Sequence, residues 1–166
     1  MSAPAAQTAD RGFAIERVFN APVQRVFRLW TDPLLVAQWW GIRNCTIPRC
    51  ELDVRAGGRW RIDMLTASGA LYRNQGSYLE VAENARLSYR DEPDPEIREW
   101  AGKPPGESRH TVTFTPEGAR THVHFEVTFA SAADRERLLA LGVRDGWTQS
   151  FDRLAQLIGR SANHAR

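Results

Sequence analysis

The sequence predicts an α+β fold in which a curved antiparallel sheet of about seven strands wraps around a long C-terminal helix, with two short helices after the first strand. Three observations predict it. Apolar and polar residues alternate through most of the middle of the chain, as they do in half-buried strands. Turn motifs such as "AGG", "AENA" and "PEGA" separate these stretches, which is typical of antiparallel hairpins. The last stretch places apolar residues at helical spacing and is long enough to cover one face of a sheet.

The first part of the chain predicts one strand and two short helices. "FAIERVF" (13–19) is typical of a strand, and Asn20 after it is an expected N-cap for the first helix. "VQRVFRLW" then repeats apolar residues at helical spacing. Thr31 or Asp32 is expected to cap the second helix, and Gly41 to end it.

The middle of the chain predicts six further strands. The alternation blurs near Gly76, which we expect to mark a bulge or a close approach of the backbone to another group. The six stretches are 50–55, 59–64, 71–81, 85–90, 109–115 and 120–130.

The remaining sequence predicts a single helix over 131–160, with Ser131 as its cap. We expect one domain over 12–160, a disordered N-terminal tail over 1–11 and a C-terminal tail over 161–166. The apolar stripe of the helix consists of Trp147, Phe151, Leu154 and Ile158.

Composition narrows the function classes. A net charge of +2 gives no reason to expect nucleic-acid binding, and no apolar run is long enough to suggest a membrane span. The start of the chain lacks the apolar stretch of a signal peptide. Cys45 and Cys50 are too few for a disulfide framework, so we expect reduced, structural thiols and a cytoplasmic protein.

Four segments carry a family resemblance: "RVFNAPVQRVFRLWTDPLLVAQWWG", "AGGRWRIDM", "GSYLEVAENARLSY" and "GWTQSFDRLAQLI". Together they resemble the activator of heat-shock protein 90 ATPase homologue-like family, part of the START-like (SRPBCC) superfamily, over about residues 13–160. The resemblance implies the helix-grip fold and a cavity between sheet and long helix that often binds lipid-like or aromatic small molecules. The family has no shared catalytic motif whose residues could be assigned to positions in this sequence.

The alternation and the helix stripe together predict which side chains face this cavity. Since a packed core needs the same residue types, part of the set is expected to be core alone. The expected apolar lining is Trp39, Trp40, Trp60, Ile62, Met64, Tyr89, Val112, Phe114, Phe125, Trp147 and Phe151.

Three polar residues are expected anchors for a ligand: Asn74, Tyr78 and His110. His110 shares a strand face with the predicted lining, although it could also lie at a strand end in solvent. The adjacent Trp39 and Trp40 cannot easily share one helix face. One is expected to pack between the short helices and the sheet and the other to cap the cavity mouth, unless both fill the core.

Neither a metal nor a cofactor is expected. His122 and His124 lie two apart on one strand and point away from its apolar face, and two histidines without a third ligand make a poor zinc site. The sequence has no nucleophile motif, phosphate loop or dinucleotide fingerprint.

The segment 91–107 is long for a connection between two strands and contains four prolines. We expect it either to fold over the cavity as a lid, with Trp100 as the contact, or to be a mobile surface loop or a contact in a homodimer.

Three functions remain open. The first is binding of a small hydrophobic or aromatic molecule, which an enclosed cavity of at least about 300 Å³ lined by Trp39 or Trp40 and by Trp60 would favour. The second is a co-chaperone that activates a heat-shock protein 90 ATPase, implied by the resemblance. The third is a cyclase or hydratase-type enzyme, against which the lack of a catalytic motif argues. A histidine with a carboxylate partner in the cavity would favour it.

Overall fold

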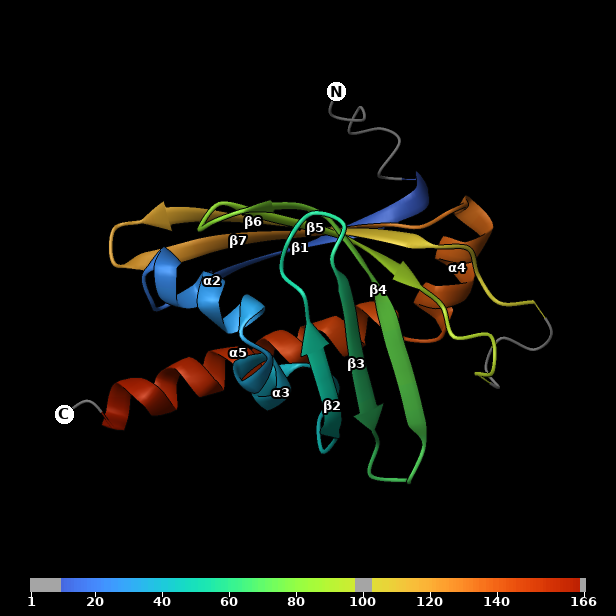
Figure 1. The fold of residues 1–166 in the computed structure, drawn as a ribbon, viewed down its shortest axis with the longest axis horizontal. Coiled ribbons are helices and arrows are strands. Elements are labelled where there is room, and N and C mark those ends of the chain that lie inside the picture. The colour runs from blue at the N-terminus through green and yellow to red at the C-terminus, as the bar shows by residue number, and fades with distance from the viewer. Residues whose placement is uncertain (1–9, 98–102, 165–166) are drawn as a thin grey trace.

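The computed structural model describes residues 10–97 and 103–164. Within them the chain forms one seven-stranded antiparallel sheet, in the order β1-β7-β6-β5-β4-β3-β2, with helices α2 and α3 after the first strand and α4 and α5 at the end (Figure 1). The predicted α+β class and strand number are confirmed. The strands are β1 (Gly12–Phe19), β2 (Thr46–Leu52), β3 (Arg59–Leu65), β4 (Leu71–Ala82), β5 (Arg86–Glu92), β6 (Ser108–Glu117) and β7 (Arg120–Thr128).

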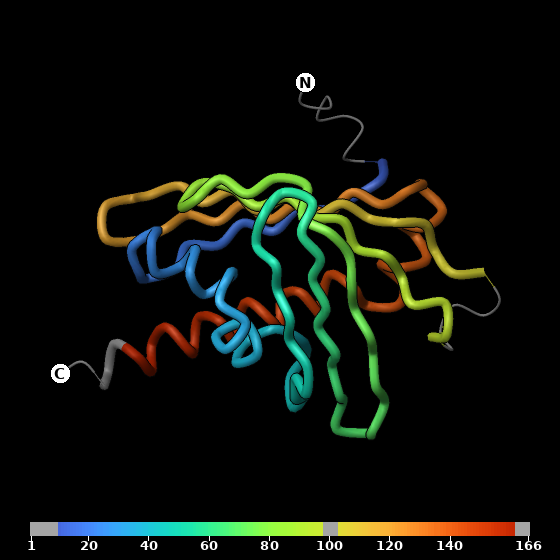
Figure 2. Tube along the Cα trace, in the orientation of Figure 1, coloured from blue at the N-terminus to red at the C-terminus, as the bar shows by residue number. Residues whose placement is uncertain are grey.

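The sheet is strongly curved, and α5 (Val143–His164) lies along its concave side. In Figure 1, β2, β3 and β4 turn steeply away from the strands around β6 and β7, and α5 runs beneath the latter. Figure 2 follows the same path as a tube, with α2 (Val23–Thr31) and α3 (Pro33–Trp39) beside α5. One face of the sheet is therefore covered by helices, as the apolar stripe predicted.

Gly76 lies at a close approach between β4 and β5, one of the two predicted alternatives. A Cβ atom there would lie 1.7 Å from the Arg90 carbonyl oxygen and 3.0 Å from Trp60 Cζ2. The register shift in this pair falls later, between Tyr78 and Glu80. Only glycine therefore lets the two backbones pack this tightly next to the Trp60 ring.

The two short helices begin and end largely as their capping residues predict. Asp32 is the cap of α3, since its carboxylate accepts a hydrogen bond from Leu34 N at 3.0 Å. The prediction for Asn20 is wrong, because Pro22 occupies the N-cap position of α2 and no side chain caps that helix. Helix α3 ends at Trp39, after which Trp40 is extended and Gly41 adopts a positive φ of 100°.

The predicted long C-terminal helix is confirmed as α5, but its predicted start at residue 131 is wrong, because a separate helix, α4 (Ala132–Ala140), precedes it. Gly142 has a φ of 90°, a left-handed conformation that ends α4 and lets the chain turn before α5 begins. Ser131 caps α4 as predicted, because its Oγ accepts a hydrogen bond from Asp134 N at 3.1 Å.

The predicted tails are only partly described. Residues 1–9 and 165–166 lie outside the described part of the chain. Arg11 already contacts the sheet, since Phe129 N–H donates to its carbonyl oxygen at 2.7 Å. Helix α5 continues to His164, past the expected end of the domain at residue 160.

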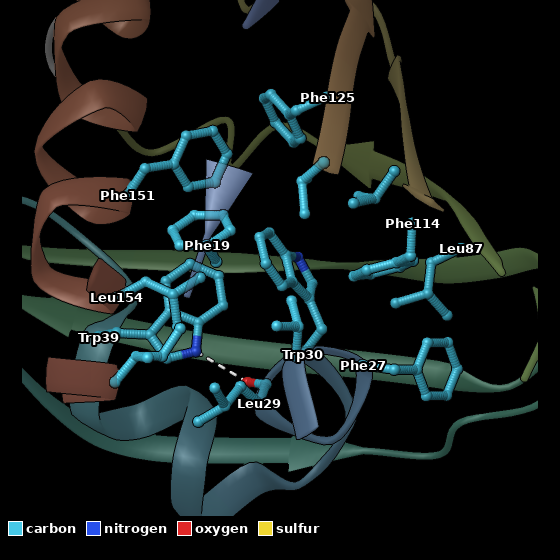
Figure 3. Packing of buried hydrophobic residues seen from close by; sticks show 14 of the residues in the cluster. Phe19, Phe27, Leu29, Trp30, Trp39, Leu87, Phe114, Phe125, Phe151 and Leu154 are labelled. Carbon is cyan, nitrogen blue, oxygen red and sulfur yellow. Dashed lines mark hydrogen bonds between the residues drawn. The ribbon is translucent and has the colours of Figure 1, made fainter. Parts of the chain in front are cut away.

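An aromatic cluster fills the space between α5, the sheet and α2 (Figure 3). Phe151 of α5 is fully buried, and its ring centroid lies 5.7 Å from that of Trp30 and 5.2 Å from that of Phe125. Trp30 in turn packs edge-on against Phe114 of β6 at 5.5 Å. These contacts join the helix to the middle of the sheet.

Two further predictions can be compared with the described residues. Cys45 and Cys50 are both free thiols, and burial raises the pKa of Cys50 to about 11. Among the helices over residues 10–97 and 103–164, none has the length and apolar character needed to cross a membrane.

Replacing Gly76 by alanine is expected to lower the free energy of unfolding by about 3 kcal/mol, because β4 and β5 must separate to admit the Cβ atom. Gly159→Ala in α5 is the matched control. A Cβ there meets no atom within 4 Å, so the change is expected to stabilise the protein by about 0.5–1 kcal/mol through helix propensity. Urea denaturation of both variants checks this, and equal effects would contradict the close approach.

Candidate functional site

Two adjoining cavities lie between the sheet and α5. The inner cavity has a volume of about 40 Å³, enough for only a few water molecules. The outer cavity has a volume of about 380 Å³, within the range of about 300–1,000 Å³ that is typical of small-molecule sites. Four residues line both cavities: Trp40, Asp91, His110 and Trp147.

Trp39 and Trp40 lie in different environments: Trp39 is in the core beside the inner cavity, and Trp40 lines both cavities. Trp39, on the last turn of α3, is fully buried, packs 4.7 Å from Trp30 and donates its indole Nε1–H to the Leu29 carbonyl oxygen at 2.8 Å (Figure 3). Trp40 follows the helix end in an extended conformation and is only partly buried. Its ring lies edge-on to that of Trp147, with centroids 5.9 Å apart. Trp40 therefore stands where the two cavities join.

Helix α5 holds the segment that carries Trp40. Nη1 of Arg153 donates to the carbonyl oxygens of Trp40 at 3.0 Å and of Ile42 at 3.1 Å. Ser150 Oγ accepts from Gly41 N at 3.1 Å and donates to the Gly41 carbonyl oxygen at 3.0 Å. Sequence reasoning missed Arg153 and Ser150, since nothing in the helix pattern marks a polar residue that binds a distant loop.

His110 is a buried, neutral side chain in the cavity wall. It lies on β6 opposite Tyr89 of β5, whose ring stacks on it with centroids 4.9 Å apart. His110 Nε2 lies 3.1 Å from Ser108 Oγ, whereas Nδ1 is buried and has no hydrogen-bond partner among the described residues. Burial lowers the pKa of His110 to about 3. The predicted strand-face position, not the alternative at a strand end in solvent, is therefore the one observed.

Asp91 is the carboxylate nearest to this histidine. It lies on β5 between Gly76 of β4 and Ser108 of β6, and its Oδ2 is 3.8 Å from His110 Nε2. Its side chain is 29% exposed and lines both cavities. Burial, with a smaller contribution from the charge of Glu92, raises the pKa of Asp91 to about 7. Sequence reasoning misses Asp91 because the alternation predicts a strand that ends at residue 90, whereas β5 continues to Glu92.

The predicted site residues fall into three groups. The inner cavity is lined by Trp39, Trp40, Trp60, Ile62, Tyr78, Tyr89, His110 and Trp147. The outer cavity is lined by Trp40, Met64, Asn74, His110 and Trp147. The remaining four are at most 3% exposed, belong to the core and line neither cavity: Val112, Phe114, Phe125 and Phe151.

Of the other two expected anchors, Asn74 faces the outer cavity and Tyr78 the inner one. Asn74 Nδ2 already donates to the Ile62 carbonyl oxygen at 3.2 Å, which fixes the orientation of its amide. Burial raises the pKa of Tyr78 well above its usual value, so this hydroxyl stays protonated.

The connection between β5 and β6 forms one side of the outer cavity. Pro93, Ile97 and Pro105 line it from the described parts of this connection. Gly106 N–H donates to Asp134 Oδ2 of α4 at 3.0 Å, which ties the connection to that helix. The expected lid residue, Trp100, lies outside the described residues.

His122 and His124 lie on β7 beside Glu16 of β1, with closest distances to its carboxylate of 3.9 Å and 3.1 Å. Neither residue lines the inner or the outer cavity. Across residues 10–97 and 103–164, no three His, Cys, Asp or Glu side chains are grouped so that they could hold a metal ion.

Arg153→Met is expected to destabilise the protein by about 2–3 kcal/mol, because three carbonyl oxygens lose a charged donor. It is also expected to increase the mobility of Trp40, measured as faster local motion in indole NMR relaxation. Arg160→Met, at an exposed position of the same helix, is the control. Equal stability losses in both variants would show that the hydrogen bonds to residues 40–42 do not hold the segment.

Asp91→Asn is expected to make the protein more stable than the wild type at pH 8, with a difference that shrinks toward pH 4. The folded-state pKa of Asp91 is raised to about 7 from an ordinary value of 3.8. The wild type therefore loses stability as the pH rises from the unfolded pKa through the folded one. Urea denaturation at several pH values checks this, and a difference that does not vary with pH would contradict the assignment.

Comparison with known proteins gives one family and many similar folds. The family model described as "Activator of Hsp90 ATPase homolog 1-like protein" matches residues 20–159. No curated protein matches the chain in sequence.

Among solved structures, protein NE0264 from Nitrosomonas europaea has a TM-score of 0.80 and 22% identity over 93% of this chain and 98% of its own. Protein CV1439 from Chromobacterium violaceum has a TM-score of 0.73 and 29% identity, covering 89% of this chain and 96% of its own. The AHSA1 protein from Silicibacter pomeroyi has a TM-score of 0.74 and 20% identity, covering 90% and 99%. The chain therefore belongs to the Activator of Hsp90 ATPase homolog 1-like family and has its START-like helix-grip fold.

Proposed function

We propose that this protein binds a small hydrophobic or aromatic molecule in the outer cavity, with Trp40 and Trp147 as its aromatic wall. The observation that carries the proposal is the volume of about 380 Å³ beside these two rings. The inner cavity, where Trp39 and Trp60 lie, is too small for such a ligand. The expected set of ligand-binding residues therefore narrows to Trp40, Met64, Asn74, His110 and Trp147, together with Asp91.

The expected affinity follows from the apolar area that such a ligand would bury. About 300 Å² of apolar surface gives about 7 kcal/mol at about 25 cal/mol per Å². The loss of translational and rotational freedom offsets several kcal/mol of this, so we expect micromolar dissociation constants. We expect the binding to take place in the cytoplasm.

The family name suggests a second candidate, activation of a heat-shock protein 90 ATPase. This would use an outer surface of the protein, so it would not need an open cavity. The Asp91–His110 pair favours the third alternative, an enzyme, but the 3.8 Å between Oδ2 and Nε2 is longer than a hydrogen bond. We therefore assign the pair to ligand recognition.

Filling the outer cavity separates these candidates. Gly146 of α5 lines the cavity, and a Cβ there would make only an ordinary contact, 3.6 Å from Ile42 Cγ2. Gly146→Leu is therefore expected to fold and to weaken binding of 1-naphthylmethanol, used as a neutral aromatic probe, at least about tenfold in calorimetry. Gly159→Leu, at an open position on the same helix, is the matched control and is expected to bind as the wild type does.

Two results would contradict the binding proposal: no binding of the probe by the wild type, or equal binding by the Gly146→Leu variant. In a heat-shock protein 90 ATPase assay, stimulation that is unchanged in Gly146→Leu would support the co-chaperone alternative. Stimulation that is lost together with probe binding would link the two activities.

A further inference from the structure

We propose that the outer cavity selects ligands in which a protonated amine is attached to the hydrophobic or aromatic body, with the Asp91 carboxylate as the counter-ion. This inference rests on the proposed binding function and adds the chemical class of the ligand. Three features of the described residues support it: a carboxylate without a cationic partner, arginine partners for the neighbouring carboxylates, and aromatic rings on the same wall.

Asp91 has no cationic partner among residues 10–97 and 103–164. No described arginine or lysine forms an ion pair with it, and the basic group that approaches is His110 Nε2, at 3.8 Å. That ring is buried and neutral, since burial lowers the pKa of His110 to about 3. A partly buried carboxylate without a cationic partner loses part of its hydration, and a bound cation would offset this loss.

The other two carboxylates of the outer-cavity wall are already paired. Both oxygens of Glu92 accept hydrogen bonds from Arg59, at 2.7 Å and 3.0 Å. Asp94 accepts from Nε of Arg73 at 2.9 Å. Asp91 is therefore the acidic group of this wall, among the described residues, whose charge remains for a ligand.

The surroundings of Asp91 suit a cation on an aromatic body. Trp40 and Trp147 line both cavities together with Asp91, and Trp147 lies 5.6 Å from His110 between ring centroids. The faces of indole rings attract cations, and more strongly where water is excluded. An anionic ligand would instead be placed beside an unpaired carboxylate, so the same wall disfavours carboxylic acids and phosphates.

The charges around Asp91 determine how binding should depend on pH. Gly76 on β4 and Ser108 on β6 face it in the sheet, and Trp147 faces the cavity from α5, so none of these adds a charge. On β5, Arg90 and Glu92 flank Asp91; Arg90 is paired with Glu107, and the charge of Glu92 raises the pKa of Asp91 further. Arg73 of β4 also lines the outer cavity, where it is paired with Asp94. Since this pKa is about 7 in the free protein, the carboxylate forms between pH 6 and pH 8.

The test uses three probes of matched shape: 1-naphthylmethylamine, 1-naphthylmethanol and 1-naphthoic acid. At pH 8 the wild type is expected to bind the cationic amine at least about tenfold more tightly than the neutral alcohol, and the acid more weakly than the alcohol. Asp91→Asn keeps the shape of the side chain and is expected to remove the preference for the amine over the alcohol. Glu117→Gln, at the β6–β7 turn, removes one negative charge far from the cavity and is the control.

A second measurement needs no variant. From pH 6 to pH 8 the affinity of the wild type for the amine is expected to rise about tenfold relative to its affinity for the alcohol, because the amine stays protonated while Asp91 ionises. This comparison decides the question if Asp91→Asn does not fold.

The outcomes separate the two proposals. Equal binding of amine and alcohol, or an amine preference that survives Asp91→Asn and does not vary with pH, would overturn the amine inference and leave the binding function standing. If the wild type binds none of the three probes, the proposed function itself is wrong.

Discussion

Helix α5 is held in the concave face of the sheet by aromatic packing around Phe151, and the rest of the molecule is arranged about that contact. The Phe151 ring touches Phe19 of β1, Trp30 of α2 and Phe125 of β7, so elements from the start and the later part of the chain meet on one side chain (Figure 3). Burying an aromatic ring of this size typically contributes about 3–5 kcal/mol. Beyond this contact, side chains do not fill all of the space between the sheet and α5, and the two cavities lie there.

That space begins one helical turn before Phe151, at Trp147. Both residues lie on the same face of α5, but Phe151 is fully buried in the cluster whereas Trp147 is partly exposed and faces the cavities. The break at Gly142 then turns the chain back into α4, whose Leu138 lines the outer cavity from the far side. The cavity is thus the unfilled continuation of the core, and this explains why its walls are largely apolar.

The sequence predicts the architecture well because strand alternation and the helix stripe are local patterns. It predicts that one of Trp39 and Trp40 packs in the core and that the other lies at the cavity mouth. It does not predict which residue takes which position, since that depends on where α3 ends and on the distant side chain of Arg153. The break at Gly142 was missed because a single glycine is tolerated in a helical pattern. The Asp91–His110 pair was missed because strand pairing, which no local pattern reveals, places the two side chains together.

The central claim is that a ligand enters the outer cavity and contacts Trp40 and Trp147 but not Trp39. Intermolecular nuclear Overhauser effects between bound 1-naphthylmethylamine and the indole protons measure this directly. The account predicts strong effects to Trp40 and Trp147 and none to Trp39, which is fully buried in the core. Effects confined to residues on the outer face of the sheet, such as His122 and His124, would contradict it.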